Sequence, residues 1–229
     1  INRINVREGD VIDEGFLIAV LEANGLELFP EDEEESSNLS EIRSDLQEVF
    51  DRHSLLLDEN RNEAVLKRRK NNSRTARENV AHLCDDGSFV EYGALTIAAQ
   101  RRRRSVEDLQ VATPADGMIA GFGTINCEDF GKENSRCAVL AYDYTVLAGT
   151  QGHNNHKKKD RIFELAGERE IPVVFFTEGG GGRPGDVDTD DLIMSWLDIR
   201  TFATWPQLSG VAPRIAINSG RCFAGNAVI

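Results

Sequence analysis

Four consecutive glycines, Gly179–Gly182, stand between a strand-like apolar segment at residues 171–178 and a helical pattern near residues 190–202. Glycine allows a turn with positive φ and lets a ligand atom come close to the backbone. A strand that ends in such a turn before a helix leaves backbone N–H groups without partners, and these groups suit a phosphate or an oxyanion. Arg183 and Pro184 stand where a phosphate-binding P-loop needs Lys and Ser or Thr. The run therefore predicts either an oxyanion hole or a tight turn without a ligand.

The charge and the cysteines of the chain restrict the classes of protein to which it can belong. With 39 acidic and 26 basic side chains the formal net charge is −13, so nucleic acid is not expected as the main partner. The four cysteines lack the C-x-x-C spacing of a zinc ribbon, and no apolar run is long enough to cross a membrane. We expect a reduced, cytoplasmic protein without a metal site. Because Ile1 and Ile229 both lie inside regular patterns, we expect a piece of a longer protein.

The hydrophobic pattern changes along the chain and predicts its organisation. Residues 1–26 form short strand-like segments around turns, residues 27–40 form an acidic, serine-rich linker, and helical turns follow from residue 41. After about residue 83, strand and helix patterns alternate, which predicts an α/β layered domain. The expected strands are 117–125, 137–143, 172–177 and 213–218, and the expected helices lie near 157–168, near 190–202 and from residue 222 onward.

A second strand–glycine–helix junction follows the first after about forty residues. It covers residues 215–227 and contains Gly220, Ala224 and Gly225. This spacing predicts two neighbouring strands with both junctions at one edge of the sheet, where open α/β sheets bind ligands. Ala224 and Gly225 would allow a ligand to approach closely, and ordinary packing of a helix on a sheet explains them equally well.

Several short motifs occur in a fixed order between residues 74 and 229. In this order and spacing the chain resembles the N-terminal half of the carboxyltransferase of biotin-dependent acyl-CoA carboxylases. The motifs are Ala76-Arg-Glu78, Asp86-Gly-Ser-Phe-Val-Glu91, Asp116-Gly117, Gly121-Phe-Gly-Thr-Ile125, Asp143-Tyr-Thr-Val-Leu147, Gly149-Thr-Gln-Gly152, Lys158, the glycine run with Arg183, and Gly220-Arg-Cys-Phe-Ala-Gly225-Asn226.

The resemblance implies a crotonase-like ββα superhelix, with its core at about residues 110–229, and a reaction. A carboxyl group passes from carboxybiotin to the α-carbon of an acyl-CoA, of the acetyl-CoA or propionyl-CoA carboxylase type, through a thioester enolate. Backbone N–H groups suit the enolate oxygen. By position, Gly181 and Gly182 would supply these groups, and Gly180 would set the turn. Asn226 stands where a smaller residue is usual in the family.

The same resemblance implies residues that hold the substrate. Lys158 and Arg183 are expected to contact the phosphates of coenzyme A, and Gly220, Ala224 and Gly225 are expected to line the acyl-CoA site. Biotin is expected on a separate carrier, with biotin carboxyl carrier and biotin carboxylase domains as partners and a homo-oligomer as the assembly.

The first segment resembles part of a biotinyl domain. Residues 6–23 match the strand that leads to the attachment turn, but Asn24-Gly25-Leu26 replaces the Met-Lys-Met of that turn. Without the lysine no biotin amide forms, so we expect a partial biotinyl-like segment at residues 1–26, followed by the linker and the carboxyltransferase half at residues 41–229.

Other interpretations stay open. His153 and His156 are possible bases, although solvated or capping histidines are favoured over that role. Glu178 suits a base in hydratase chemistry, and Cys222 is either a nucleophile or a small packed side chain. The alternative functions are another crotonase-fold reaction on a CoA thioester, such as decarboxylation, and a non-catalytic module that binds CoA or serves in assembly.

Overall fold

A computed structural model describes residues 3–7, 12, 16–20, 41–188 and 199–229. The chain divides into two units, Ile1–Ser44 and Asp45–Ile229. In the first unit, strands β1 (Arg3–Ile4) and β2 (Ala19–Val20) pair antiparallel. The predicted linker at residues 27–40 and most of the predicted strand at residues 8–15 lie outside the described residues.

The second unit is built on a sheet whose strands lie in the order β3-β4-β5-β6-β7. The pairs β3–β4 and β4–β5 are antiparallel, whereas β5–β6 and β6–β7 are parallel. The four strands predicted from residue 117 onward are confirmed, each within two residues at either end. The strands are β3 (Val90–Glu91), β4 (Met118–Thr124), β5 (Arg136–Tyr142), β6 (Val173–Phe176) and β7 (Arg214–Ile217).

Helices precede the sheet and connect its strands. The helical turns predicted after residue 41 and the helix predicted near 157–168 are confirmed, the latter beginning four residues earlier. The α-helices are α1 (Ser44–Ser54), α2 (Asn62–Lys70), α3 (Ala76–Leu83), α4 (Val106–Ala112), α5 (Cys127–Phe130), α6 (His153–Glu168), α7 (Thr201–Gln207) and α8 (Gly225–Val228). Short 3₁₀ turns occupy Asp58–Asn60, Pro114–Gly117 and Leu147–Gly149.

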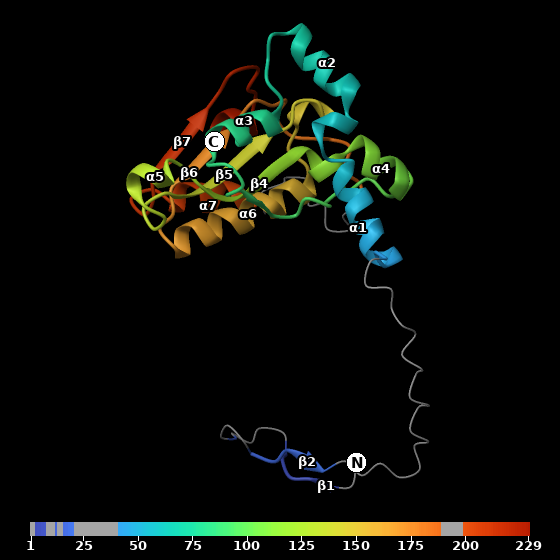
Figure 1. Ribbon diagram of the computed structural model, residues 1–229, viewed down its shortest axis with the longest axis vertical. Helices are drawn as coiled ribbons and strands as arrows, with labels where there is room; N and C mark the ends of the chain where they lie inside the picture. The colour runs from blue at the N-terminus through green and yellow to red at the C-terminus, as the bar shows by residue number, and fades with distance from the viewer. Residues whose placement is uncertain (1–2, 8–11, 13–15, 21–40, 189–198) are drawn as a thin grey trace. The chain divides into compact units, whose positions relative to one another are not determined.

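Helices cover both faces of the sheet, as Figure 1 shows, with α3 on one face and α6 and α7 on the other. Alternate residues of β5 serve the two faces: Leu140 packs in the core under α6, and Val139 packs in the core under α3. A strand buried on both sides needs a continuous apolar sequence, and β5 has one in Cys137-Ala-Val-Leu-Ala-Tyr142. No helix that the structure describes is both long and apolar enough to cross a bilayer.

The parallel strands position the loops that matter for function. Because β5, β6 and β7 run in the same direction, the segments that follow them emerge at one edge of the sheet. These segments are residues 143–152, 177–184 and 218–224, and α6 begins at the end of the first. The edge predicted from the two glycine junctions is therefore present, and a third loop joins it.

The core makes a direct prediction for stability. Phe175 is fully buried, and its ring lies 5.1 Å from that of Tyr142 and 6.2 Å from that of Trp205. Replacing Phe175 by Ala leaves a cavity and is expected to lower the free energy of unfolding by about 3–5 kcal/mol. Denaturant titration measures this value. The control Phe130→Ala removes a ring that is 62% exposed and should change the free energy by about 0.5 kcal/mol or less. Similar losses in both variants would contradict this assignment of the core.

Candidate active site

The three loops at the carboxyl edge are joined by backbone hydrogen bonds. Gln151, in the loop after β5, forms an isolated parallel bridge with Gly182 in the loop after β6. Gly179 forms a second parallel bridge with Cys222 in the loop after β7. The N–H of Phe223 donates to the carbonyl of Gly179 over 3.0 Å. The two glycine junctions therefore lie together, as their spacing in the sequence predicts.

The glycines of the run differ in what their N–H groups do. The N–H of Gly180 donates to the carbonyl of Ala148 over 2.9 Å, and that of Gly181 donates to Oδ1 of Asn226 over 3.0 Å. The N–H of Gly182 has no acceptor among the described residues, and Gly182 is the last glycine before Arg183. Positive φ occurs at Gly181, at 89°, so the turn is set by Gly181 and not by Gly180 as the resemblance implied.

Asn226 connects this turn to its neighbours. Its side chain is fully buried, and Oδ1 accepts from the Gly181 N–H and from Nε2 of Gln151 over 3.1 Å. Its Nδ2 donates to the carbonyls of Gly149, over 3.2 Å, and Thr177, over 3.5 Å. One amide therefore holds three loops. The sequence showed only that Asn226 departs from the usual small residue, and this departure was the signal of its role.

A buried lysine extends the same network. Lys159 is fully buried in α6, and its Nζ donates to the hydroxyl of Tyr142 and to Oε1 of Gln151, both over 2.7 Å. Burial holds the pKa of Lys159 well below its usual value. Sequence reasoning missed this residue, although helical spacing places Lys159 on the same face of α6 as the core residues Ile162 and Phe163.

Arg183 lies inside an ionic cluster at the N-terminus of α6. Its guanidinium pairs with the carboxylates of Asp116 and Asp186, and its side chain is 4% exposed. The other oxygen of Asp116 accepts from the N–H of Asn155, and Asp186 accepts from the N–H of His153, each over 2.8 Å. Burial raises the pKa of Asp116, and the Arg183 guanidinium opposes this shift. The hydrogen bond from the Asn155 N–H also lowers the pKa of Asp116.

Lys158 also points inward. Its Nζ donates to the carbonyls of Ala115, over 3.1 Å, and Met118, and burial lowers its pKa to about 8. Both Lys158 and Arg183 therefore use their charges inside the protein in this structure. Their contact with the phosphates of coenzyme A stays a prediction, and it would require each side chain to leave the partners described here.

A pocket of about 370 Å³ opens beside the glycine run. Gly182 and Gly225 contribute backbone to its wall, and His156 and Phe202 contribute rings. The remaining lining residues are Gln151, Arg183, Pro184 and Ile199. The pocket therefore brings Gly182, whose N–H has no acceptor among the described residues, together with apolar and aromatic surface.

The helix expected directly after the glycine run is not adjacent to it. Residues 183–188 are not helical, and residues 189–198 lie outside the described part of the chain. The helix that meets the run is α6, through the bridge between Gln151 and Gly182 and the ion pairs of Arg183. The α6 N–H groups of His153 and Asn155 are held by the two carboxylates, so they are not available to a ligand.

His156 is buried, which differs from the solvated or capping role that its sequence position favoured. Its ring nitrogen Nδ1 lies 2.8 Å from Oγ1 of Thr201, at the start of α7. Burial lowers the pKa of His156 to about 2, so the ring is neutral at physiological pH. His153, one turn earlier, is partly exposed and donates its backbone N–H to Asp186.

Close packing explains why two further predicted site residues, Gly220 and Ala224, are small. A Cβ atom at Gly220 would lie 2.2 Å from Oε1 of Glu178, whose carboxylate pairs with Arg68 through contacts of 2.9 and 2.7 Å. This pairing occupies both carboxylate oxygens of Glu178. Ala224 takes a positive φ of 45°, and its Cβ would lie 3.0 Å from a Cβ at Gly181. Small residues are therefore required where the two junctions meet.

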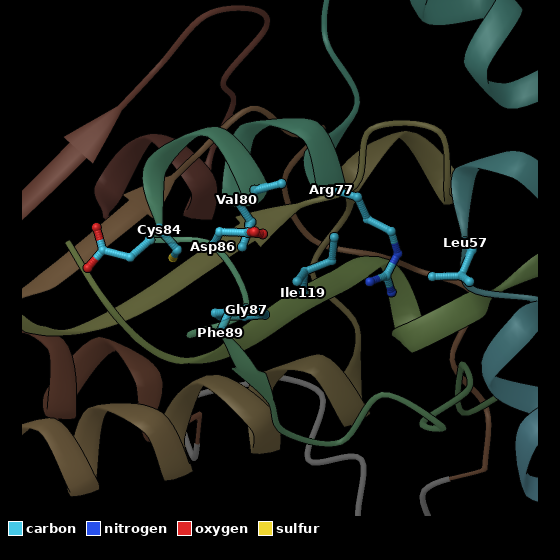
Figure 2. A pocket seen from close by; sticks show the side chains of 10 residues that line it. Leu57, Arg77, Val80, Cys84, Asp86, Gly87, Phe89 and Ile119 are labelled. Atoms are coloured by element: carbon cyan, nitrogen blue, oxygen red, sulfur yellow. The ribbon is translucent and has the colours of Figure 1, made fainter. Parts of the chain in front are cut away.

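A second pocket, of about 310 Å³, lies under α3 on the other face of the sheet. Figure 2 shows Arg77 and Val80 of α3, and Cys84 directly after it, above Phe89 and Ile119. Burial raises the pKa of the Cys84 thiol to about 11, so it is not a thiolate at neutral pH. None of the residues that line this pocket belongs to the glycine loops.

Comparison with known proteins identifies the family. Residues 67–229 match the carboxyl transferase domain family. The chain is 32% identical over 180 residues to the biotin-dependent long chain acyl-coenzyme A carboxylase beta4 subunit of Mycobacterium tuberculosis (strain ATCC 25618 / H37Rv). That alignment covers 79% of this chain and 31% of the relative, so the chain spans about a third of its length.

Solved structures agree with this assignment. A single-chain, multi-domain long-chain acyl-CoA carboxylase matches with 54% identity and a TM-score of 0.76, over 82% of this chain and 18% of the other. The transcarboxylase 12S hexamer with hydrolysed methylmalonyl-coenzyme A bound matches with 26% identity and a TM-score of 0.64, over 82% and 34%. The fold is the crotonase-like α/β fold of carboxyltransferases. Because the family match covers more than half of its residues, the chain belongs to the carboxyl transferase domain family.

Proposed function

We propose that the protein transfers a carboxyl group from carboxybiotin to the α-carbon of an acyl-CoA. The observation that carries this proposal is the N–H of Gly182, which lacks an acceptor among the described residues and stands in the wall of a pocket at the carboxyl edge of the sheet. Family membership supports the reaction class, as do relatives described as biotin-dependent acyl-coenzyme A carboxylases.

The chemistry requires a stabiliser for an enolate oxygen. When the α-carbon of a thioester loses its proton, negative charge develops on the thioester oxygen, and a fixed N–H directed at this oxygen stabilises the transition state more than the ground state. The Gly182 N–H is the donor that we assign. In this structure the Gly181 N–H is held by Asn226, so Gly181 shapes the turn and joins the oxyanion hole only if that bond opens. Gly180, whose N–H is also bonded internally, supports the turn.

The second glycine junction and the assembly take part in this reaction as well. Gly220, Ala224 and Gly225 keep the second junction small enough for acyl-CoA to reach the glycine run. Carboxybiotin is a substrate delivered by a separate carrier, and a biotin carboxylase domain supplies its carboxyl group. The related transcarboxylase 12S protein assembles as a hexamer, which supports a homo-oligomer here. We further propose a cytoplasmic location.

We also propose a domain organisation. The pair β1–β2 supports a partial biotinyl-like segment at residues 1–26, because that segment resembles the strands before an attachment turn. Residues 27–40 would form the linker, and residues 41–229 the N-terminal half of the carboxyltransferase domain.

Exchange of the acyl-CoA α-proton with solvent deuterium tests the function. The full-length protein that carries this chain is incubated with acyl-CoA in deuterated water, with and without free biotin, and mass spectrometry measures the label. Carboxyl transfer predicts exchange that depends on biotin. Exchange without biotin would favour another reaction on the CoA thioester, and no exchange under either condition would contradict an enolate mechanism.

Gly182→Leu tests the assigned donor. A Cβ atom at Gly182 meets nothing within 4 Å, and its backbone does not have positive φ, so the variant should fold. The added side chain keeps the thioester oxygen away from the N–H, and we expect kcat of carboxyl transfer to fall by about 100-fold or more. Steady-state kinetics on the full-length protein measure this loss.

Pro184→Leu provides the control, because Pro184 lines the same pocket without supplying the donor. Its kcat should stay within about threefold of the wild-type value. If both variants lose activity equally, blockage of the pocket explains the loss and the Gly182 N–H does not. A substitution at Gly181 is less informative, because its positive φ makes any side chain there strained.

Asn226→Ala tests the amide that holds the loops. The substitution leaves the Gly181 N–H and the Gly149 carbonyl without their partner, and we expect unfolding free energy to fall by about 2–3 kcal/mol, with a loss of kcat. Differential scanning calorimetry and initial rates measure the two effects. The control Asn62→Ala, at an exposed position in the first turn of α2, should leave both unchanged. Wild-type stability in the Asn226 variant would show that the loops are held by other contacts.

A further inference from the structure

His156 is placed between the core and the pocket that contains Gly182. It lies in the first turns of α6, is 8% exposed, and lines the pocket together with Phe202, whose ring centre lies 6.1 Å from that of His156. Among the described residues Nδ1 contacts Thr201 and the ring makes an edge contact with Phe202, and Nε2 has no hydrogen-bond partner there. A ring nitrogen that has no partner among the described residues, on a side chain that lines a pocket, is a group that a ligand can satisfy.

The hydrogen bonds on the other side of the ring fix its tautomer. The Thr201 hydroxyl has one proton, which it donates to Oδ1 of Asp160 over 2.6 Å. The contact of 2.8 Å between Thr201 and His156 must then use a proton on Nδ1 of the histidine. Nε2 therefore carries a lone pair, and the chain from Asp160 through Thr201 to His156 presents an acceptor to the pocket.

The charges around the ring keep it neutral. Burial lowers the pKa of His156 to about 2, and Lys159, His153 and Arg183 act in the same direction. The carboxylate of Asp160 is linked to the ring only indirectly, through the hydroxyl of Thr201. A group with this pKa is a poor general base near pH 7, because it holds an accepted proton too weakly. It remains a good hydrogen-bond acceptor.

We propose that Nε2 of His156 accepts a hydrogen bond from an N–H group of the substrate whose thioester oxygen lies at Gly182. This inference rests on the proposed function and adds a positioning contact to it. The pocket wall then offers one donor, the Gly182 N–H, and one acceptor, Nε2, to a ligand that carries both a carbonyl and an N–H. Acyl-CoA is such a ligand, because two methylene groups and the sulfur separate its thioester from an amide. The ureido ring of biotin is another.

His156→Phe tests the acceptor while keeping a ring of similar size. With the full-length protein, KM in the biotin-dependent exchange of the acyl-CoA α-proton is measured separately for acyl-CoA and for free biotin. Calorimetry measures the dissociation constant for acyl-CoA without turnover. Loss of one neutral hydrogen bond should raise the KM of the substrate that supplies the N–H by about 3- to 10-fold, with the other KM unchanged. A rise for acyl-CoA assigns the amide, and a rise for biotin assigns the ureido group.

Two further variants separate this role from a structural one. His156→Gln keeps an acceptor near the position of Nε2 and should restore KM to within about twofold of the wild type. Thr201→Val keeps His156 but removes the bond that fixes its tautomer, and should raise the same KM. These two variants carry the test if His156→Phe does not fold, which its unfolding midpoint shows.

The pH profile distinguishes an acceptor from a base. Between about pH 5 and 8, kcat/KM of the wild type and of His156→Phe should have the same shape, because the ring stays neutral throughout. An ionisation in this range that the variant abolishes would overturn the proposal, as would unchanged KM values in all three variants. If the wild type transfers no carboxyl group, the proposed function fails, and the calorimetric comparison still decides whether His156 contacts acyl-CoA.

Discussion

The site depends on one buried amide. Asn226 accepts from Gln151 and from the glycine run, and it donates to the carbonyls of Gly149 and Thr177 in the same two loops. Because Asn226 itself follows the loop after β7, it fixes the loops after β5, β6 and β7 relative to one another. The three strands bring these loops to one edge, and isolated backbone bridges join Gln151 to Gly182 and Gly179 to Cys222. Asn226 adds a buried side chain that hydrogen-bonds to the first two of these loops at once. A catalytic N–H must be held to within a fraction of an ångström to act as a preorganised donor.

A second buried network supports the same turn from the side of α6. Arg183 follows the glycine run directly, and its guanidinium is held by Asp116, which precedes β4, and by Asp186. The two carboxylates also accept N–H groups at the start of α6. Buried ions are desolvated, so such a cluster stabilises the fold only when its charges and hydrogen bonds are well matched. Here the cluster connects the glycine run to the start of β4 and to α6, so its main effect is to fix the position of the glycine run.

The sequence predicted the sheet well and the polar interior poorly. Strands β4 to β7 and the meeting of the two glycine junctions followed from apolar runs, glycine positions and the order of motifs. The roles of Lys158, Lys159 and Arg183 did not, because a charged residue is normally expected at the surface. Whether such a side chain is buried depends on partners far away in sequence: Asp116 is 67 residues from Arg183. The sequence also could not show which backbone N–H of the glycine run is open to a ligand, because four identical residues differ only in the acceptors that their N–H groups meet in the fold.

The most direct measurement is a crystal structure of the full-length protein with an acyl-CoA bound. The account predicts that the thioester oxygen lies about 2.7–3.1 Å from the backbone nitrogen of Gly182, inside the pocket that His156 and Phe202 line. The backbone bridges between the loops should be present in the complex as they are here. A thioester bound in the pocket under α3, or one at the glycine edge whose oxygen faces away from Gly182, would contradict it.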